Sequence, residues 1–272
     1  VLSFKRELDM TYDAHHFVEA EHIRLLGFKR RPNGRWVSAK SEDTFLPVFE
    51  GRMVHQYDHA AKEYASGSGR SAKWNAPRPG EGQVSPHYFV KESYARSRGW
   101  TPMERVGYCE ISGHANERTV LASLIPTYAV CGNKVPVLKV HEGSIQTQLV
   151  WLAFANSLVV DWMIRRWVST TINQFYWKNI PFPHSLTSKD EEFLILAARS
   201  LSIMKSPKER PANWLGKRAQ LRAAIDAVVM NIYGITNAEL DTLLDDFPLF
   251  TKAAIRANCT SISLRSLLDL YR

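Results

Sequence analysis

The feature that most constrains the fold is an apolar segment near the middle of the chain, LVWLAFANSLVVDWMI, residues 149–164. Asn156, Ser157 and Asp161 interrupt it, and Arg165 and Arg166 close it. A membrane-spanning helix needs about 20 apolar residues, so this segment is too polar for that role. Its apolar residues recur at helical spacing. We therefore expect one long helix over residues 141–168, buried in a core that the rest of the chain builds around it.

Short strand-like runs precede this segment. They are RVGYCEI (105–111), TVLASLIPTYAV (119–130) and KVPVL (134–138), rich in β-branched and aromatic residues. The pair Asn33-Gly34 marks a hairpin turn, because both residues tolerate positive φ. Residues 66–86 contain four Gly and three Pro, which predicts a long loop.

The chain after the apolar segment is expected to be helical. Pro181 and Pro183 end regular structure first. Two capping boxes follow, Ser188 with Glu191 and Thr236 with Glu239, and a helix between them ends near Gly234. The fold class is therefore α+β, with a mixed strand-rich lobe, a long helix and a helical tail. We expect two domains, residues 1–185 and 186–272.

Charge and cysteine content narrow the class of protein. The chain has 35 Lys and Arg against 27 Asp and Glu, a net charge of +8, which favours an anionic partner such as nucleic acid. Its three cysteines form no CxxC pair, so a disulfide-stapled secreted protein is not expected. The sequence begins at Val1 without a recognisable leader, and we expect it to be a piece of a longer intracellular protein.

The segment HQYDH, residues 55–59, offers two interpretations. On a helix, His55 and His59 would share one face, as in HExxH zinc sites, and Asp58 would add a ligand. However, Gln56 stands where that motif has Glu, and no ligand cluster elsewhere supports a metal. The alternative is a polar surface that binds a partner.

The segment SGHANERT, residues 112–119, also allows two interpretations. Asn116 has the side chain that pairs with adenine and Arg118 the one that pairs with guanine, but Glu117 is placed to hold Arg118 in an ion pair. No P-loop, no GxSxG elbow and no dinucleotide-binding glycine loop is present. These absences favour a binding module over an enzyme.

Several blocks together resemble a known family. In order they are FKRELDMTYDAHHF (4–17), LPVFEGRMVHQYDHAA (46–61), RVGYCEISGHANERTVLASLIP (105–126), FANSLVVDWMIRRWVSTTINQFYWKNIPFP (154–183) and KRAQLRAAIDAVVMNIYGITNAELDTLLDDFP (217–248). They are similar to the C-terminal target-recognition region of bacterial adenine-specific DNA methylases of the Type IIG-like restriction-modification and phage-defence systems. Phe49 and Arg52 depart mildly from the pattern. The resemblance runs over about residues 3–248.

The resemblance implies a division of labour. In such enzymes a nuclease domain and a methyltransferase domain, which binds S-adenosylmethionine and carries an Asn-Pro-Pro-Tyr motif, come first. In this chain NAPRP (75–79) breaks that motif, so we expect no catalytic residue, no metal and no cofactor here. S-adenosylmethionine, and Mg²⁺ if the parent protein cuts DNA, belong to the missing domains. The expected partners are double-stranded DNA and the methyltransferase domain of the same polypeptide, in the bacterial cytoplasm and without a membrane.

The same resemblance suggests which residues face DNA, with Met53, Val54 and Tyr57 packed beneath them. The predicted contacts are Arg52, His55, Gln56, His59, Arg70, Lys73, Arg105, Asn116, Arg118, Arg165, Arg166 and Lys178. Arg165 and Arg166 have an alternative role at the negative end of the long helix. Two rival functions are a metal-dependent hydrolase or nuclease that uses His55, Asp58 and His59, and a separate specificity subunit of a multisubunit enzyme.

Overall fold

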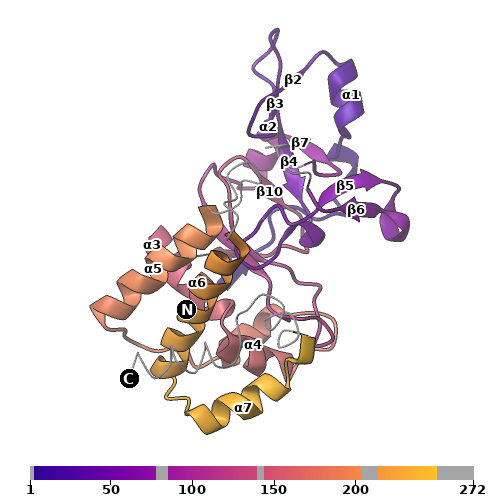
Figure 1. Ribbon diagram of the computed structural model, residues 1–272. Coiled ribbons are helices and arrows are strands. Elements are labelled where there is room, and N and C mark those ends of the chain that lie inside the picture. Colours follow the sequence, from indigo (N-terminus) through magenta and orange to yellow (C-terminus); the bar gives the residue numbers. More distant parts are fainter. Residues whose placement is uncertain (1–2, 78–84, 140–143, 204–213, 250–272) are drawn as a thin grey trace.

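A computed structural model describes residues 3–77, 85–139, 144–203 and 214–249. Figure 1 shows a strand-rich N-terminal part and a helical C-terminal part that meet along the middle of the molecule. The α+β class predicted from the sequence is confirmed, with antiparallel pairing in most of the sheets.

The first sheet joins the two parts. Its order is β1 (Ser3–Lys5), β11 (Val137–Lys139), β8 (Arg105–Tyr108) and β9 (Ala122–Ile125), and all neighbours are antiparallel. Every residue of β8 and β9 is buried. The strand-like runs predicted at 105–111, 119–130 and 134–138 therefore each contain a strand.

The second sheet builds the far end of the N-terminal part. Its main path is β10 (Val130–Cys131), β4 (Thr44–Phe49), β3 (Trp36–Val37) and β2 (Lys29–Arg30), and β7 (Phe89–Lys91) pairs with β4. The predicted hairpin is confirmed, because β2 pairs antiparallel with β3 and Gly34 has a φ of 85°. Two short helices, α1 (Ala20–Leu25) and α2 (Glu92–Ser97), accompany this sheet.

The predicted loop 66–86 is partly regular. The strands β5 (Glu63–Ser66) and β6 (Lys73–Asn75) pair antiparallel, with the short helical turn η3 (Gly69–Ser71) between them. Trp74 packs edge-on against Tyr64, with ring centroids 5.8 Å apart. This cross-strand aromatic pair stabilises a hairpin that the glycine content concealed. Residues 78–84 of the predicted loop lie outside the described residues.

The predicted long helix is two helices. Helix α3 (Ile145–Ala155) and helix α4 (Leu158–Arg165) bend by 65° at their junction. Asn156 there pairs with the backbone of Ala122 on β9, accepting from its N–H and donating to its C=O, both at 3.0 Å. Ser157 then caps α4 by accepting from Val160 N–H at 3.3 Å. Asn156 and Ser157 break the helix because the first has a tertiary partner and the second caps α4, whereas Asp161 lies within α4.

The tail is helical, as predicted. It contains α5 (Ser188–Ile203), α6 (Trp214–Ile232) and α7 (Asn237–Asp245). The capping box of Thr236 and Glu239 is confirmed, and Gly234, just beyond α6, has a φ of 68°. The other box is wrong by one residue, because Thr187 and not Ser188 accepts from a backbone N–H of the first turn, that of Asp190 at 3.1 Å.

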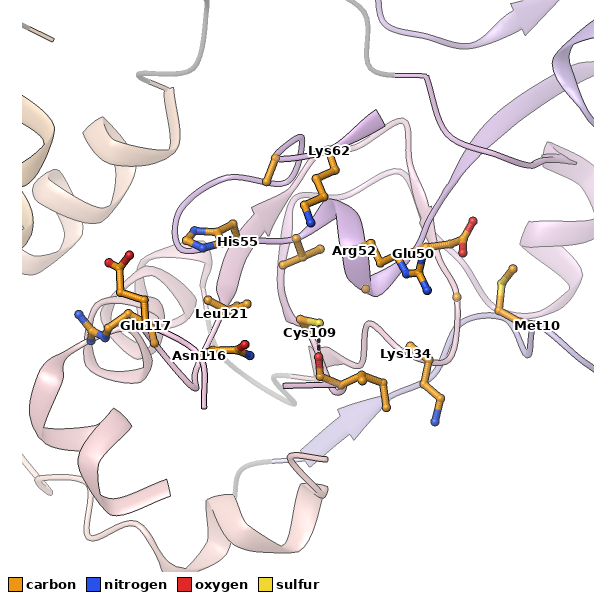
Figure 2. Close-up of a pocket in the computed structure, with 16 residues that line it drawn as sticks. Met10, Glu50, Arg52, His55, Lys62, Cys109, Asn116, Glu117, Leu121 and Lys134 are labelled. Atoms are coloured by element: carbon orange, nitrogen blue, oxygen red, sulfur yellow. Dashed lines mark hydrogen bonds between the residues drawn. The ribbon is translucent and has the colours of Figure 1, made fainter. Parts of the chain in front are cut away.

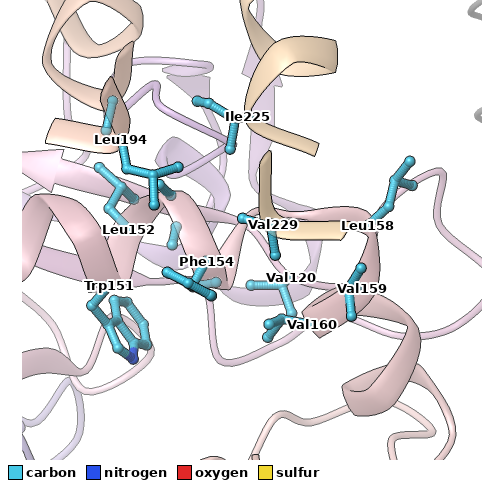
Figure 3. Close-up of a cluster of buried hydrophobic side chains, with 14 of the residues drawn as sticks. Val120, Trp151, Leu152, Phe154, Leu158, Val159, Val160, Leu194, Ile225 and Val229 are labelled. Carbon is cyan, nitrogen blue, oxygen red and sulfur yellow. The ribbon is translucent and has the colours of Figure 1, made fainter. Parts of the chain in front are cut away.

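One hydrophobic cluster runs through both parts of the molecule. Leu152 and Phe154 of α3 lie with Leu194 of α5 and Val229 of α6, and Val120 reaches them from the sheet side (Figure 3). Each is buried, and full burial of such a side chain contributes about 1.5–3 kcal/mol. The division at residues 185 and 186 stays a prediction, and the cluster crosses it.

In the part of the chain that the structure describes, no single helix is long and apolar enough to cross a membrane. The bent pair α3 and α4 together reaches the required length and composition.

Candidate functional site

The HQYDH segment is a tight turn and not a helix. His55 N–H donates to Asp58 C=O at 2.7 Å, and Asp58 N–H donates back to His55 C=O at 3.0 Å. Tyr57 inside the turn has a φ of 56°, the one positive φ of a non-glycine residue in the described ranges. His55 and His59 therefore do not share a helix face, and the geometric premise of the metal-site alternative is wrong. Among the described residues, no group of three or more His, Cys, Asp or Glu is placed to hold a metal ion.

Gln56, predicted to contact DNA, points into the protein instead and is 1% exposed. Its amide donates to the carbonyls of Val120 at 3.0 Å and Asn156 at 3.2 Å. Two arginines of α6 complete the set: Arg222 donates to the side-chain oxygen of Gln56, and Arg218 to its backbone carbonyl at 2.8 Å. The predicted burial of Met53, Val54 and Tyr57 beneath this turn is confirmed. The turn thus locks the strand-rich part onto α6.

Two of the predicted DNA-contacting arginines are buried in ion pairs. Arg118 is 2% exposed and its Nε lies 2.7 Å from Asp161. Arg105 is 7% exposed and binds both carboxylate oxygens of Glu7, at 2.7 and 2.6 Å. Their guanidinium groups are engaged inside the fold, so the structure corrects both assignments. Arg118 pairs with Asp161, the carboxylate that α4 buries beside it.

His59 is half-buried and its ring is engaged. Its Nδ1 lies 3.1 Å from the carbonyl of Leu124, and the ring stacks on Phe49 with centroids 5.4 Å apart. These contacts hold His59 against β4 and β9, so this residue also anchors the turn to the strands.

A cavity of about 610 Å³ opens beside the turn. Four of the predicted site residues line it, namely Arg52, His55, Asn116 and Arg118. Figure 2 shows Lys62 extending over the cavity between His55 on one side and Arg52 with Glu50 on the other, with Leu121 and Cys109 below it; Asn116 and Glu117 lie on the same side as His55. Sequence analysis missed Lys62, Lys134, Glu50 and Glu117 as site residues. Glu50 and Lys62 flank the HQYDH turn, and only the tertiary fold brings Glu117 and Lys134 to them.

His55 lines the cavity and lies near three arginines. Burial within the protein lowers the pKa of His55 to about 4, and Arg222, Arg218 and Arg118 lower it further while Asp58 opposes them. His55 is nevertheless exposed at the surface of the turn; the protein packed around its ring and the nearby arginines favour the neutral imidazole at pH 7. Burial also raises the pKa of the Glu50 carboxyl, and Arg52 opposes this shift.

Cations at the cavity mouth differ in how firmly they are held. Lys134 Nζ lies 3.1 Å from the buried carboxylate of Glu110. Arg52 is exposed and donates to the carbonyl of Ala72 at 3.2 Å. Lys62 is exposed, and within the described ranges it has no ion pair or hydrogen bond. Lys62 is therefore the cation most available to a ligand.

The remaining predicted residues lie outside this cavity. Lys73 on β6 and Lys178 on η4 (Gln174–Asn179) are exposed. Arg165 donates to the carbonyls of His114 and Asn116 and holds the 112–118 segment in place. Arg166 pairs with Asp246. Arg70 belongs to η3, and its side chain lies outside the described part.

No protein-family model matches the chain, and no curated protein matches it significantly. The solved structures that are similar in shape include that of the Type IIL restriction-modification enzyme MmeI in complex with DNA. The TM-score is 0.48 and the identity 12%, over 93% of this chain and 36% of that chain. The chain thus spans about a third of the length of that enzyme. A likeness of this size defines neither a fold nor a function.

Proposed function

We propose that this chain recognises double-stranded DNA as the specificity domain of a restriction-modification adenine methyltransferase. Its support from the sequence is the ordered set of family-like blocks and the net charge of +8. The observation that carries the proposal is the cation-rimmed cavity beside the HQYDH turn, where Arg52 and Lys62 stand at the mouth and Asn116 at the far end. Cations bind phosphates without reading sequence, and a carboxamide reads a base edge.

The proposal assigns chemistry to other parts of the polypeptide. S-adenosylmethionine binding and methyl transfer belong to a methyltransferase domain, since NAPRP (75–79) lacks the Asn-Pro-Pro-Tyr sequence. The proposed DNA contacts are exposed side chains, namely Arg52, His55, Lys62, Lys73, Asn116 and Lys178, whereas the exposed Arg166 pairs with Asp246. Gln56, Arg105 and Arg118 hold the scaffold that positions them.

Fluorescence anisotropy with a labelled duplex, at two salt concentrations and with EDTA throughout, tests the proposal. We expect binding that persists in EDTA and weakens steeply with salt, because each phosphate contact releases a counterion. A selection from randomised duplexes then gives the recognised sequence. Absence of duplex binding at low salt, in a chain that circular dichroism shows to be folded, contradicts the proposal.

A further inference from the structure

We propose that the cavity beside the HQYDH turn binds a single nucleotide, with its phosphate at the Lys62 and Arg52 end and its base at the Asn116 end. The inference deepens the proposed function and rests on it for one source of the nucleotide, a residue drawn out of bound duplex DNA. A free mononucleotide is the other source. Both present the same groups to the protein, a phosphate and an unpaired base.

The size of the cavity fits this ligand. Its volume of about 610 Å³ lies within the range of about 300–1,000 Å³ that is typical of small-molecule sites. A stacked duplex cannot enter such a space, so only a nucleotide that has left the helix can fill it. Unpairing and unstacking one base costs a few kcal/mol, which contacts inside the cavity have to offset.

The middle of the cavity is apolar and uncharged. Val54, Leu121 and Cys109 line it. Burial raises the pKa of the Cys109 thiol to about 11, and this thiol donates to the carbonyl of Ile111 at 3.2 Å. It therefore stays protonated at neutral pH and is an apolar wall. A base that has left the stack is held in such sites between apolar side chains.

The two ends differ in chemistry, which sets the orientation. At one end, Lys62 and Arg52 supply exposed cations, and the Glu50 carboxyl beside Arg52 has a pKa that burial raises. At the other end, Asn116 donates to Ser112 Oγ at 3.2 Å, and its side-chain oxygen has no partner among the described residues. A carboxamide held in this way can still accept from a base amino group. Glu117 beside it adds a second acceptor.

Arg165 gives this end its rigidity. Its guanidinium donates to the carbonyls of His114 and Asn116, at 2.5 Å for Asn116. It also lies over the Phe247 ring, 4.4 Å from the centroid. Arg165 on α4 therefore links the segment that carries Asn116 and Glu117 to Phe247, which follows α7, before any ligand binds.

The first arm of the test uses the four deoxynucleoside 5′-monophosphates in isothermal titration calorimetry with the full chain. The variant Lys62→Ala should weaken binding at least tenfold, whereas Lys217→Ala, an exposed lysine on α6 away from the cavity, should leave it unchanged. The variant Ala61→Trp should block binding, because Ala61 lines the cavity and an indole there fills it. Its matched control is Ala65→Trp, an exposed position on β5 outside the cavity.

The second arm uses duplexes that carry 2-aminopurine at successive positions of the selected site. A rise in fluorescence on binding, lost in Lys62→Ala and Ala61→Trp but kept in Ala65→Trp, identifies extruded DNA as the source. Mononucleotide binding without a rise identifies the free nucleotide. If neither arm responds while the duplex still binds, the cavity proposal fails and the DNA-recognition proposal stands. If mononucleotides bind and the duplex does not, the cavity proposal stands and the DNA-recognition proposal fails. Circular dichroism of each variant checks that it folds. If Ala61→Trp does not fold, Lys62→Ala still tests the proposal, because Lys62 is exposed and its replacement leaves the core unchanged.

Discussion

Arg222 on α6 donates a hydrogen bond to the side-chain oxygen of Gln56, a residue 166 positions earlier in the chain. The contact joins the HQYDH turn to the helical part of the molecule. Through Val120 and Asn156, the same glutamine also joins the sheet and the break between α3 and α4. Gln56, which was predicted to face DNA, is therefore a buried residue that holds the HQYDH turn beside the cavity in place.

The first prediction concerns this glutamine. Replacing Gln56→Leu removes the acceptor for Arg222 and the donor for Val120, and a buried polar group left without a partner costs about 1–3 kcal/mol. We expect a lower urea midpoint with an unchanged m-value. The matched control is Gln146→Leu, an exposed glutamine on α3, which should leave the midpoint nearly unchanged. Equal midpoints for the two variants would contradict a structural role for Gln56.

The second prediction contrasts two arginine–aspartate pairs. Arg118 and Asp161 are both buried, with side chains 1% and 0% exposed, whereas Arg166 and Asp246 are 51% and 38% exposed. Breaking a buried pair by removing one partner costs about 3–5 kcal/mol, because the other charge stays uncompensated. An exposed pair contributes at most about 1 kcal/mol. Arg118→Met should therefore lower the free energy of unfolding several times more than Arg166→Met. Thermal and urea denaturation of the two variants measure this difference.

The double variant Arg118→Met with Asp161→Asn tests whether the unpaired charge causes the loss. It removes both buried charges, keeps an acceptor for Thr119 N–H, which donates to Asp161 at 3.0 Å, and should recover stability relative to Arg118→Met alone. A double variant that is less stable than Arg118→Met alone would contradict the charge explanation.

The third prediction follows from the lowered pKa of His55, about 4 in the folded chain against an ordinary value of 6.5. The unfolded chain binds a proton at this residue between these pH values and the folded chain does not, so stability rises with pH in this window. His55 therefore contributes stability that is complete above pH 6.5 and declines as the pH falls towards 4. Replacing His55→Asn should flatten the unfolding free energy over that range. The control His22→Asn, at an exposed histidine on α1, should leave the profile as it is, and an NMR titration of His55 measures the pKa directly.

Local patterns were sufficient for much of the fold. The strand runs around 105–138, the Asn33-Gly34 hairpin and the Thr236 capping box depend on residues within a few positions of each other, and each was predicted. The break between α3 and α4 was missed because it depends on Ala122, 34 positions from Asn156. The β5–β6 hairpin was missed because glycines masked its cross-strand aromatic pair.

The candidate site was predicted less completely, for a physical reason. Charge and hydrogen-bonding capacity are visible in the sequence, but burial is not. Gln56, Arg105 and Arg118 have the side chains of DNA-contacting residues, yet the fold uses them as buried connectors. Lys62 and Lys134 belong to no recognisable motif. Only the packing of β4, the HQYDH turn and the 112–118 segment brings them to one cavity.

The last prediction separates phosphate contacts from base contacts among the exposed residues. Replacing Lys73→Ala or Lys178→Ala should weaken binding of all duplexes alike, and each should lower the slope of log K against log salt by about 1. Replacing Asn116→Ala should leave that slope unchanged and weaken the selected site alone, because a good bidentate base contact discriminates by about 1–3 kcal/mol. Anisotropy titrations at four salt concentrations, with the selected duplex and a scrambled duplex, measure both quantities. The control is Lys189→Ala, an exposed lysine at the start of α5, for which neither quantity should change. If Asn116→Ala alters both duplexes equally, the 112–118 segment supports the DNA backbone and base reading lies elsewhere on the exposed face.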